Sequence, residues 1–360
     1  MHIGERILLA AAVAAGLVAE GRGDDPGDAA DDTVYVWTGA GGDRLWTNPS
    51  NWAPSNPGGT YPNSAQATAD FRSAEGPTVV DLPVSVAVAK LDLGKKGADV
   101  TLRRSADGEV ALSPGSIATA EDLSFTIDGL ALSYNGLAYA KGMRFTVANG
   151  ASFETRHETQ LHADGAVLEV KGGSSYVQND WTISISGTGS RLVVDDAYVS
   201  SKTSLWLSRN SGGRGNAIEI RGKNPRIRTA GLVVGRDSVS DVPPRIVFVI
   251  PEGGYAETPF DFTSKGGDFA SDNGRGQTVD ISVDPDSPAF GGASCRVRLA
   301  ACAGGGRVRK GNIGFPPRRR SERLTFRYAY GADGSAEDDG TDPTALWVDV
   351  AKNPFVLRIR

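Results

Sequence analysis

The sequence predicts an all-β fold: a single-stranded parallel β-helix (β-solenoid) with an aromatic N-terminal cap and an irregular β-rich C-terminal end. Glycine is abundant, at 46 of 360 residues, and no long stretch has the periodicity of a helix. One short pattern also recurs, in which two apolar residues flank a small or polar one and a glycine or Asn-Gly follows. Its copies are Phe125–Gly129, Phe145–Gly150, Leu168–Gly172, Ile183–Gly187 and Ile218–Gly222, with an earlier relative at Leu91–Gly94.

The spacing of these copies predicts the turns of the solenoid. Their starts advance by 20, 23, 15 and 35 residues, which indicates turns of about 17 to 23 residues with loops of varying length. Alternation along a strand points both apolar residues of a copy inward, where they stack on the next turn. The glycine then lets the backbone turn a corner, often with a positive φ, at little steric cost.

The N-terminus predicts export. Residues 1–19 have the form of a signal peptide, because Arg6 precedes an apolar run, Ile7 to Ala19, that is too short to span a bilayer comfortably. A short buried core helix is the alternative. Residues 20–33, rich in Gly, Asp and Ala, are expected to form an acidic linker. We therefore expect a secreted or cell-surface (extracytoplasmic) protein with no transmembrane span in the mature chain.

Three further segments follow the linker. Residues 34–90 are predicted to form the N-terminal cap and the first strands, 91–235 the regular turns, and 236–360 an irregular β continuation or a C-terminal cap. A solenoid needs covered ends, because exposed terminal strands would pair with other chains. Trp37, Trp46 and Trp52 in the cap are expected to plug the open end of the core. A stacking platform for sugar rings is the alternative for them.

The chain has two cysteines, Cys295 and Cys302. In an exported protein, a pair this close predicts one local disulfide that closes a short hairpin-like loop. Two free buried thiols are the alternative. With no third cysteine and no histidine nearby, the pair does not indicate a zinc site.

The cap segment carries motif elements in an unusual order. Trp37-Thr38-Gly39 is followed by Trp46, Asn51-Trp52 and Ala69-Asp70-Phe71. This order resembles the start of secreted bacterial parallel β-helix proteins with autotransporter-associated-type strand repeats, common in planctomycete and verrucomicrobial lineages. The similarity covers residues 34 to 94 in motif detail and the later repeats only in style. It implies an extracytoplasmic β-helix of a kind that usually has no assigned activity.

Parallel β-helices include pectate-lyase-like enzymes, so an enzyme is the second class of function that the fold allows. Such an enzyme needs acidic calcium ligands and a basic residue on one face of successive turns. The densest candidates are two groups. The first is Arg156, His157 and Glu158, with His162 nearby, and the second is Asp195, Asp196 and Lys202. The offset of five between the two histidines points them to opposite faces of a strand. Solvated turn residues are therefore the favoured interpretation of both groups.

Candidates for ligand and metal contacts lie at two other places. Trp206 lies between Leu205 and Leu207, and alternation turns it outward, near Tyr198, as a ligand or partner contact. No cofactor is expected, and calcium is the one that these acidic residues could bind, although their spacing fits neither an EF-hand nor a nonapeptide calcium repeat. Solvated acidic loops are the favoured interpretation. The calcium candidates are Asp280, Asp284 and Asp286, and the later group Asp333, Glu337, Asp338, Asp339 and Asp342.

Together these features predict a secreted, non-catalytic β-helix that acts as a structural or adhesive surface-associated module and binds a polysaccharide or cell-surface glycan. The alternative is a carbohydrate-active enzyme, either a pectate-lyase-like polysaccharide lyase or a glycoside hydrolase. Nucleic acid is not expected as a partner, because the net charge is −5 and the basic run Arg318–Arg320 with Arg323 lacks interleaved aromatics.

Overall fold

A computed structural model describes residues 32–56, 59–209, 213–235, 242–262, 266–272, 276–302, 305–315, 324–329 and 343–351. The chain from Thr33 onward forms one compact unit. The predicted signal peptide and the linker up to residue 31 lie outside the described residues. Within the described part of the chain, no helix has the length and apolar character needed to cross a membrane.

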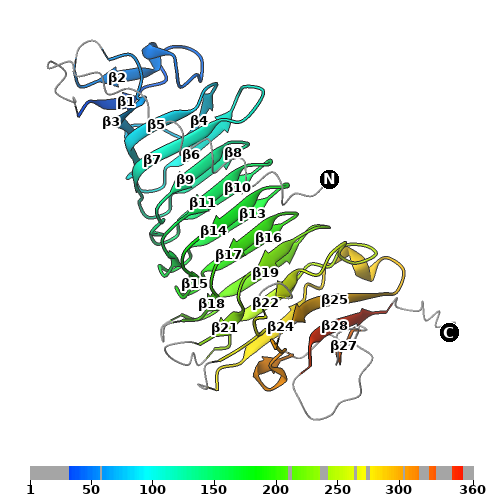
Figure 1. Cartoon of the computed structure of the whole chain (residues 1–360). Coiled ribbons are helices and arrows are strands. Elements are labelled where there is room, and N and C mark those ends of the chain that lie inside the picture. The colour runs from blue at the N-terminus through cyan, green and yellow to red at the C-terminus, as the bar shows by residue number, and fades with distance from the viewer. Residues whose placement is uncertain are drawn as a thin grey trace, which may run out of the picture. The chain divides into compact units, whose positions relative to one another are not determined.

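The fold is the predicted parallel β-solenoid, built from three sheets that we call A, B and C. A complete turn passes from sheet B to sheet A and then to the short sheet C, and Figure 1 shows the strands of successive turns stacked side by side. In spatial order, sheet B contains β26 (Ile313–Gly314), β24 (Val279–Val283), β22 (Arg245–Phe248), β19 (Ala217–Arg221), β16 (Arg191–Asp195), β13 (Val167–Lys171), β10 (Arg144–Ala148), β8 (Ser124–Asp128), β6 (Asp99–Arg104) and β4 (Pro77–Leu82).

Sheet A is the longest sheet, and sheet C is confined to four turns. Sheet A contains β2 (Trp52–Pro54), β1 (Val34–Trp37), β3 (Ser64–Asp70), β5 (Val86–Asp92), β7 (Ala111–Ala118), β9 (Ala131–Tyr134), β11 (Ser152–Thr155), β14 (Ser175–Gln178), β17 (Tyr198–Ser201), β20 (Arg226–Arg228), β23 (Phe260–Phe262), β25 (Cys295–Cys302), β28 (Ala345–Val350) and β27 (Leu324–Ala329). Sheet C contains β12 (Thr159–Leu161), β15 (Ile183–Ile185), β18 (Leu205–Leu207) and β21 (Leu232–Val234). Three short 3₁₀ helices are described: η2 (Pro49–Asn51), η3 (Pro288–Phe290) and η4 (Lys310–Asn312).

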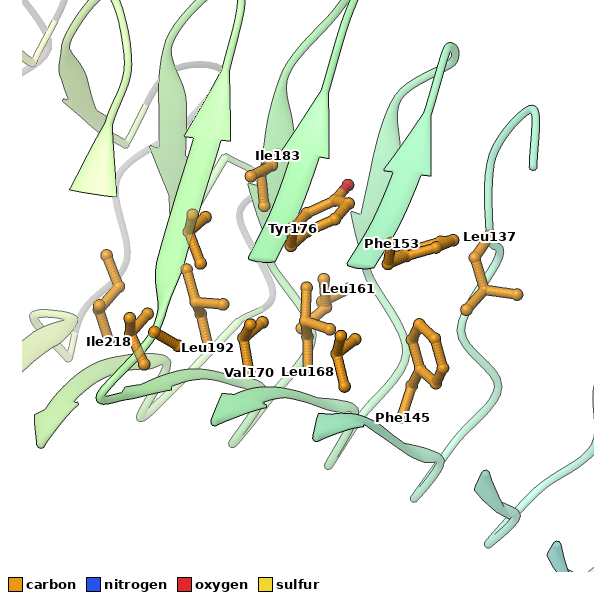
Figure 2. Packing of buried hydrophobic residues seen from close by; sticks show 14 of the residues in the cluster. Leu137, Phe145, Phe153, Leu161, Leu168, Val170, Tyr176, Ile183, Leu192 and Ile218 are labelled. Carbon is orange, nitrogen blue, oxygen red and sulfur yellow. The ribbon is translucent and has the colours of Figure 1, made fainter. Parts of the chain in front are cut away.

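The core runs along the inside of the solenoid as stacked rows of equivalent side chains. In sheet B, the row contains Phe125, Phe145, Leu168, Leu192 and Ile218, each aligned with the next and each fully buried. Figure 2 shows the inward side chains of this region meeting those of the facing strands. The rings of Phe125 and Phe145 stack with centroids 5.1 Å apart. The inward alternation predicted from the repeats therefore builds one continuous core.

The structure corrects the assignment of the repeats to turns. Ile183–Gly187 belongs to β15 in sheet C and is not the next copy in sheet B. That place is taken by Leu192–Asp196, whose last residue replaces the expected glycine. Equivalent residues of neighbouring turns, from Phe125 through Ile246, are consequently 20, 23, 24, 26 and 28 positions apart. The pattern could not separate the sheets, because every strand of a solenoid buries one face and alternates in the same way.

The N-terminal cap buries its tryptophans, as predicted for a plug. Trp37, Trp46 and Trp52 are 6%, 0% and 4% exposed and pack around Phe71. The indole of Trp46 donates a hydrogen bond to the carbonyl of Pro62 (2.9 Å), and that of Trp52 donates to the carbonyl of Trp46 (2.7 Å). Both polar indole groups are thereby satisfied within the cap. These three rings are not available as a sugar platform.

The parallel ladders begin before residue 91 and continue past residue 235. β3 pairs with β5 and β4 with β6 at one end, and β22 pairs with β24 and β23 with β25 at the other. β28 and β27 then join sheet A as antiparallel strands. Arg296 on β25 and Arg327 on β27 both hydrogen-bond to Asp349 on β28, and these bonds hold the pKa of Asp349 below its ordinary value. Charge pairs across the strands thus support the antiparallel end.

The predicted disulfide is wrong. Cys295 and Cys302 are the two ends of a single extended strand, β25, and both are free thiols. Seven residues of extended strand span about 23 Å, whereas the Cα atoms of a disulfide lie within about 7 Å of one another. The predicted hairpin-like loop does not form, because these residues pair with β23 and β28 on either side.

Thiol titration checks this correction. We expect unfolded protein, without reductant, to show two reactive thiols. In the folded protein Cys302 is expected not to react near neutral pH, because burial raises its pKa to about 12 and the thiolate is the reactive form. Cys295, which is partly exposed and whose pKa burial also raises, should react slowly and faster as the pH increases. If the unfolded protein showed no reactive thiol until reductant was added, the two cysteines would be joined in a disulfide after all.

Candidate functional site

The most distinctive surface of the solenoid is the corner at which sheet A passes into sheet C. The last residues of β11, β14 and β17 are aligned: Thr155 with Gln178, and Gln178 with Ser201. The residues that follow them, Arg156, Asn179 and Lys202, therefore hold equivalent places on three consecutive turns. The backbone N–H of Asn179 donates to the carbonyl of Thr155 (2.8 Å), and that of Lys202 donates to the carbonyl of Gln178 (2.9 Å). We call residues 156–158, 179–182 and 202–203 the corner ridge.

An exposed tryptophan stands on the middle turn of the corner ridge. Trp181 is 53% exposed, the highest value among the large apolar residues of the described chain that are exposed. Its backbone is held on both sides: its N–H donates to Oε1 of Gln178 (2.6 Å), and its carbonyl accepts from Oγ of Ser201 (2.8 Å). Nε2 of Gln178 also donates to the carbonyl of His157 on the previous turn (3.0 Å). Buried side chains thus fix the peptide while its ring stays in solvent.

A polar network lies beneath this corner. Gln178 and Ser201 are 1% and 0% exposed, so the side chains that hold the ridge are themselves buried, and their hydrogen bonds to it are partly buried. On the neighbouring turn, Oγ1 of Thr155 lies 3.1 Å from the hydroxyl of Tyr176, which donates to Oγ1 of Thr159. Burial raises the pKa of Tyr176 to about 12, so its hydroxyl stays protonated at neutral pH. These buried hydrogen bonds position the surface above them.

The side chains around Trp181 offer hydrogen-bond donors and acceptors. Nζ of Lys202 lies 3.3 Å from Oδ1 of Asp180, with both side chains at least half exposed. The amide of Asn179 donates to the carboxylate of Glu154. Arg156 and His157 are exposed on the previous turn. Four of the six predicted catalytic candidates, Arg156, His157, Glu158 and Lys202, consequently share the ridge, although they come from turns that are not adjacent.

Glu158 is already occupied by neighbours. Its carboxylate forms an ion pair with Arg209 and accepts hydrogen bonds from Thr182 (3.2 Å) and Gln160 (2.7 Å). These contacts cross from the ridge onto the outer face of sheet C. A general acid or base must reach a substrate proton, and three donors compete for this carboxylate.

The predicted ligand contact Trp206 lies on the same outer face of sheet C. It points outward between buried Leu205 and Leu207, as alternation predicts. The guanidinium of Arg209 lies over its ring, with Cζ 4.4 Å from the ring centroid. A cation over the ring stabilises the pair, and it covers one face of the indole. Tyr198 starts β17 in sheet A and pairs with Ser175 and Arg226, so it does not lie on the same sheet as Trp206.

His162 follows β12 and faces the same sheet. Its Nε2 lies 2.9 Å from Oγ of Ser184, which is fully buried, and burial lowers the pKa of the imidazole. His157 precedes the same strand and is exposed. The two histidines therefore lie at opposite ends of β12 and form no joint site.

Asp195 ends β16 in sheet B, and Asp196 follows it at a different corner, before β17 in sheet A. Asp196 has a φ of +48°, at the place where Gly222 on the next turn has +78°. Its carboxylate accepts hydrogen bonds from the backbone N–H groups of Lys223 and Asn224. Aspartate tolerates this left-handed conformation better than most residues, and here it joins one turn to the next. The structure does not bring this pair to the corner ridge.

The calcium candidates are spread over separate places. Asp280 lies on β24, and Asp284, just after that strand, accepts a hydrogen bond from the backbone N–H of Asp286 (2.8 Å). In the described ranges, no group of three or more His, Cys, Asp or Glu side chains is arranged to hold a metal ion. The later acidic group, Asp333 to Asp342, and the basic run Arg318–Arg320 with Arg323 lie outside the described residues.

Sequence reasoning missed Trp181. The signal was its position directly after Asn179-Asp180, in a connection between two strands, where no alternation assigns a side chain to the core. Comparison of the chain with known protein families, with curated proteins and with solved structures finds no match. The geometry of the corner ridge is therefore what bears on the function.

Proposed function

We propose that this protein is an extracytoplasmic, non-catalytic β-solenoid that binds polysaccharide at the corner ridge. The observation that carries the proposal is Trp181, which is 53% exposed while buried Gln178 and Ser201 hold its backbone. Exposing an indole to water is unfavourable, and a monomer gains nothing from fixing it there. A prearranged ring lowers the conformational entropy that a ligand would otherwise have to overcome.

The chemistry around the ring favours a carbohydrate. A pyranose presents C–H groups on its faces and hydroxyls on its rim, so it suits a flat apolar ring surrounded by polar groups. Asp180, Lys202 and Arg156 supply acceptors and donors beside Trp181. The predicted export signal agrees with an extracellular ligand.

The ridge favours binding over turnover. Glycoside hydrolysis commonly uses two carboxyl groups about 5 to 10 Å apart, one of them free to donate a proton. The ridge carboxylates Glu158 and Asp180 are both engaged with cations, Arg209 and Lys202. A solenoid face of this kind presents an extended surface along several turns, which suits an adhesive or structural module.

Binding to immobilised polysaccharides tests the proposal. The full chain, after export, is expected to bind at least one glucan, mannan, xylan or polyuronate without releasing reducing ends or unsaturated products. Trp181→Ala is expected to weaken that binding at least 10-fold, the effect of removing a central aromatic contact. Trp347→Ala is the matched control. Trp347 is a partly exposed tryptophan on β28, outside the ridge, and the guanidinium of Arg298 lies over its ring. Equal affinities for both variants, or product formation, would contradict the proposal.

A further inference from the structure

The corner ridge is elongated across the turns and not along one strand. Arg156, Asn179 and Lys202 occupy equivalent places on three consecutive turns, and Trp181 belongs to the middle one. Neighbouring strands of a sheet lie about 4.8 Å apart, so the backbones of the outer two positions are about 10 Å apart. Polar residues therefore lie on the turns before and after the one that carries Trp181, in the direction of the solenoid axis.

Charges along this row are balanced. Besides the imidazole of His157, the ridge and its immediate neighbours carry three cations, Arg156, Lys202 and Arg209, and three carboxylates, Glu154, Glu158 and Asp180. Asp180 lies 3.3 Å from Lys202, and Glu154 is hydrogen-bonded to Asn179. A site for a polyanion would present an excess of positive potential. The ridge instead offers donors and acceptors without a net charge.

We infer that the ligand of the ridge is a linear, uncharged polysaccharide whose chain crosses successive turns of the solenoid. One sugar ring lies on Trp181, and the units on either side hydrogen-bond near Arg156 and near Lys202. This inference rests on the proposed polysaccharide binding. It adds the charge class of the ligand, its direction on the surface and a minimum length of three units.

A calorimetric titration with oligosaccharides of one to six units tests the inference. The probes are oligomers of glucan, mannan and xylan as the neutral series and oligomers of polygalacturonate as the acidic series. A neutral trisaccharide is expected to bind at least 10-fold more tightly than the monosaccharide, with little further gain beyond three or four units. Raising the salt from 50 to 500 mM is expected to change this affinity less than twofold, because no net charge is neutralised on binding.

Two variants place the ligand on the ridge. Arg156→Ala and Lys202→Ala are each expected to weaken trisaccharide binding about 3- to 10-fold, the loss of one or two hydrogen bonds, and to weaken monosaccharide binding less. Both residues are exposed, so folding should be preserved, as a thermal melt would verify. Lys141→Ala, an exposed lysine before β10 and away from the ridge, is the matched control and should bind like the unmodified protein.

The outcomes separate this inference from the proposed function. Binding that Trp181→Ala abolishes but that is equal for one and three units overturns the inference and leaves the proposed function intact. The inference is also overturned, and the proposed function again left intact, if the acidic oligomers bind more tightly than the neutral ones and added salt removes their binding. If no polysaccharide binds, or if Trp181→Ala has no effect on the binding, both the proposed function and the inference fail.

Discussion

Replacing Gly187 by alanine is expected to destabilise the middle of the solenoid by at least about 3 kcal/mol, the range of severe single substitutions. Gly187 lies at the corner after β15, where successive turns touch through their backbones. A Cβ atom at this position would lie 2.1 Å from the carbonyl oxygen of Ala163 and 2.4 Å from its carbon. A flexible side chain could move aside, but backbone that is hydrogen-bonded into two neighbouring turns cannot do so without breaking the ladder.

The measurement is chemical denaturation combined with hydrogen exchange, because a solenoid can lose a few turns before the rest unfolds. Faster exchange is expected first in the turns that contain β12, β15 and β18. Gly311→Ala serves as the control, since a Cβ there meets no heavy atom within 4 Å. It should change stability by no more than about 0.5 kcal/mol. Equal stabilities of the two variants would show that the turns are not in backbone contact at this corner.

Replacing Trp46 by alanine is expected to cost about 3 to 5 kcal/mol and to open the N-terminal cap. Trp46 is fully buried, packs on Trp52 and Phe71, and donates to the carbonyl of Pro62. The substitution leaves a large cavity and an unpaired buried carbonyl. Loss of the cap also uncovers strand edges at that end of sheet A, which can pair with another chain.

Two measurements would detect the opening of the N-terminal cap in Trp46→Ala. The midpoint of thermal unfolding should fall, and light scattering should detect oligomers that form as the temperature rises. Trp181→Ala makes the same chemical change at an exposed side chain and should alter stability by less than about 1 kcal/mol. If Trp46→Ala and Trp181→Ala lowered the stability equally, burial of the Trp46 ring would not be what holds the N-terminal cap together.

The sequence was sufficient for the fold because the core depends on a local signal. Pairs such as Phe125 and Ile127 alternate with polar residues, and this alternation alone decides which face of a strand is buried. The same signal cannot say which sheet a strand joins. Ile183 and Leu192 alternate alike, yet the first lies in sheet C and the second in sheet B. Pairing between strands of neighbouring turns, which lie far apart in the sequence, makes that distinction.

The functional site was harder to predict because it depends on register. Trp181 gains its fixed position from Gln178 on its own turn and Ser201 on the next, and no spacing in the sequence reveals that their side chains converge. Trp181 was missed by the sequence analysis, whereas Asp196 was selected although its role is structural. It was a candidate for catalysis as an acidic residue beside another, whereas its φ of +48° and its bonds to the next corner give it the place of a glycine.

Turn length in this solenoid is not constant, although the distance between turns is. Hydrogen bonds fix the separation of neighbouring strands, while the number of residues per turn grows from 20 to 28 between Phe125 and Ile246. The additional residues enter the corners. Insertions and deletions there would change the outer surface and leave the buried rows in register, so recognition can evolve in this protein almost independently of its folding.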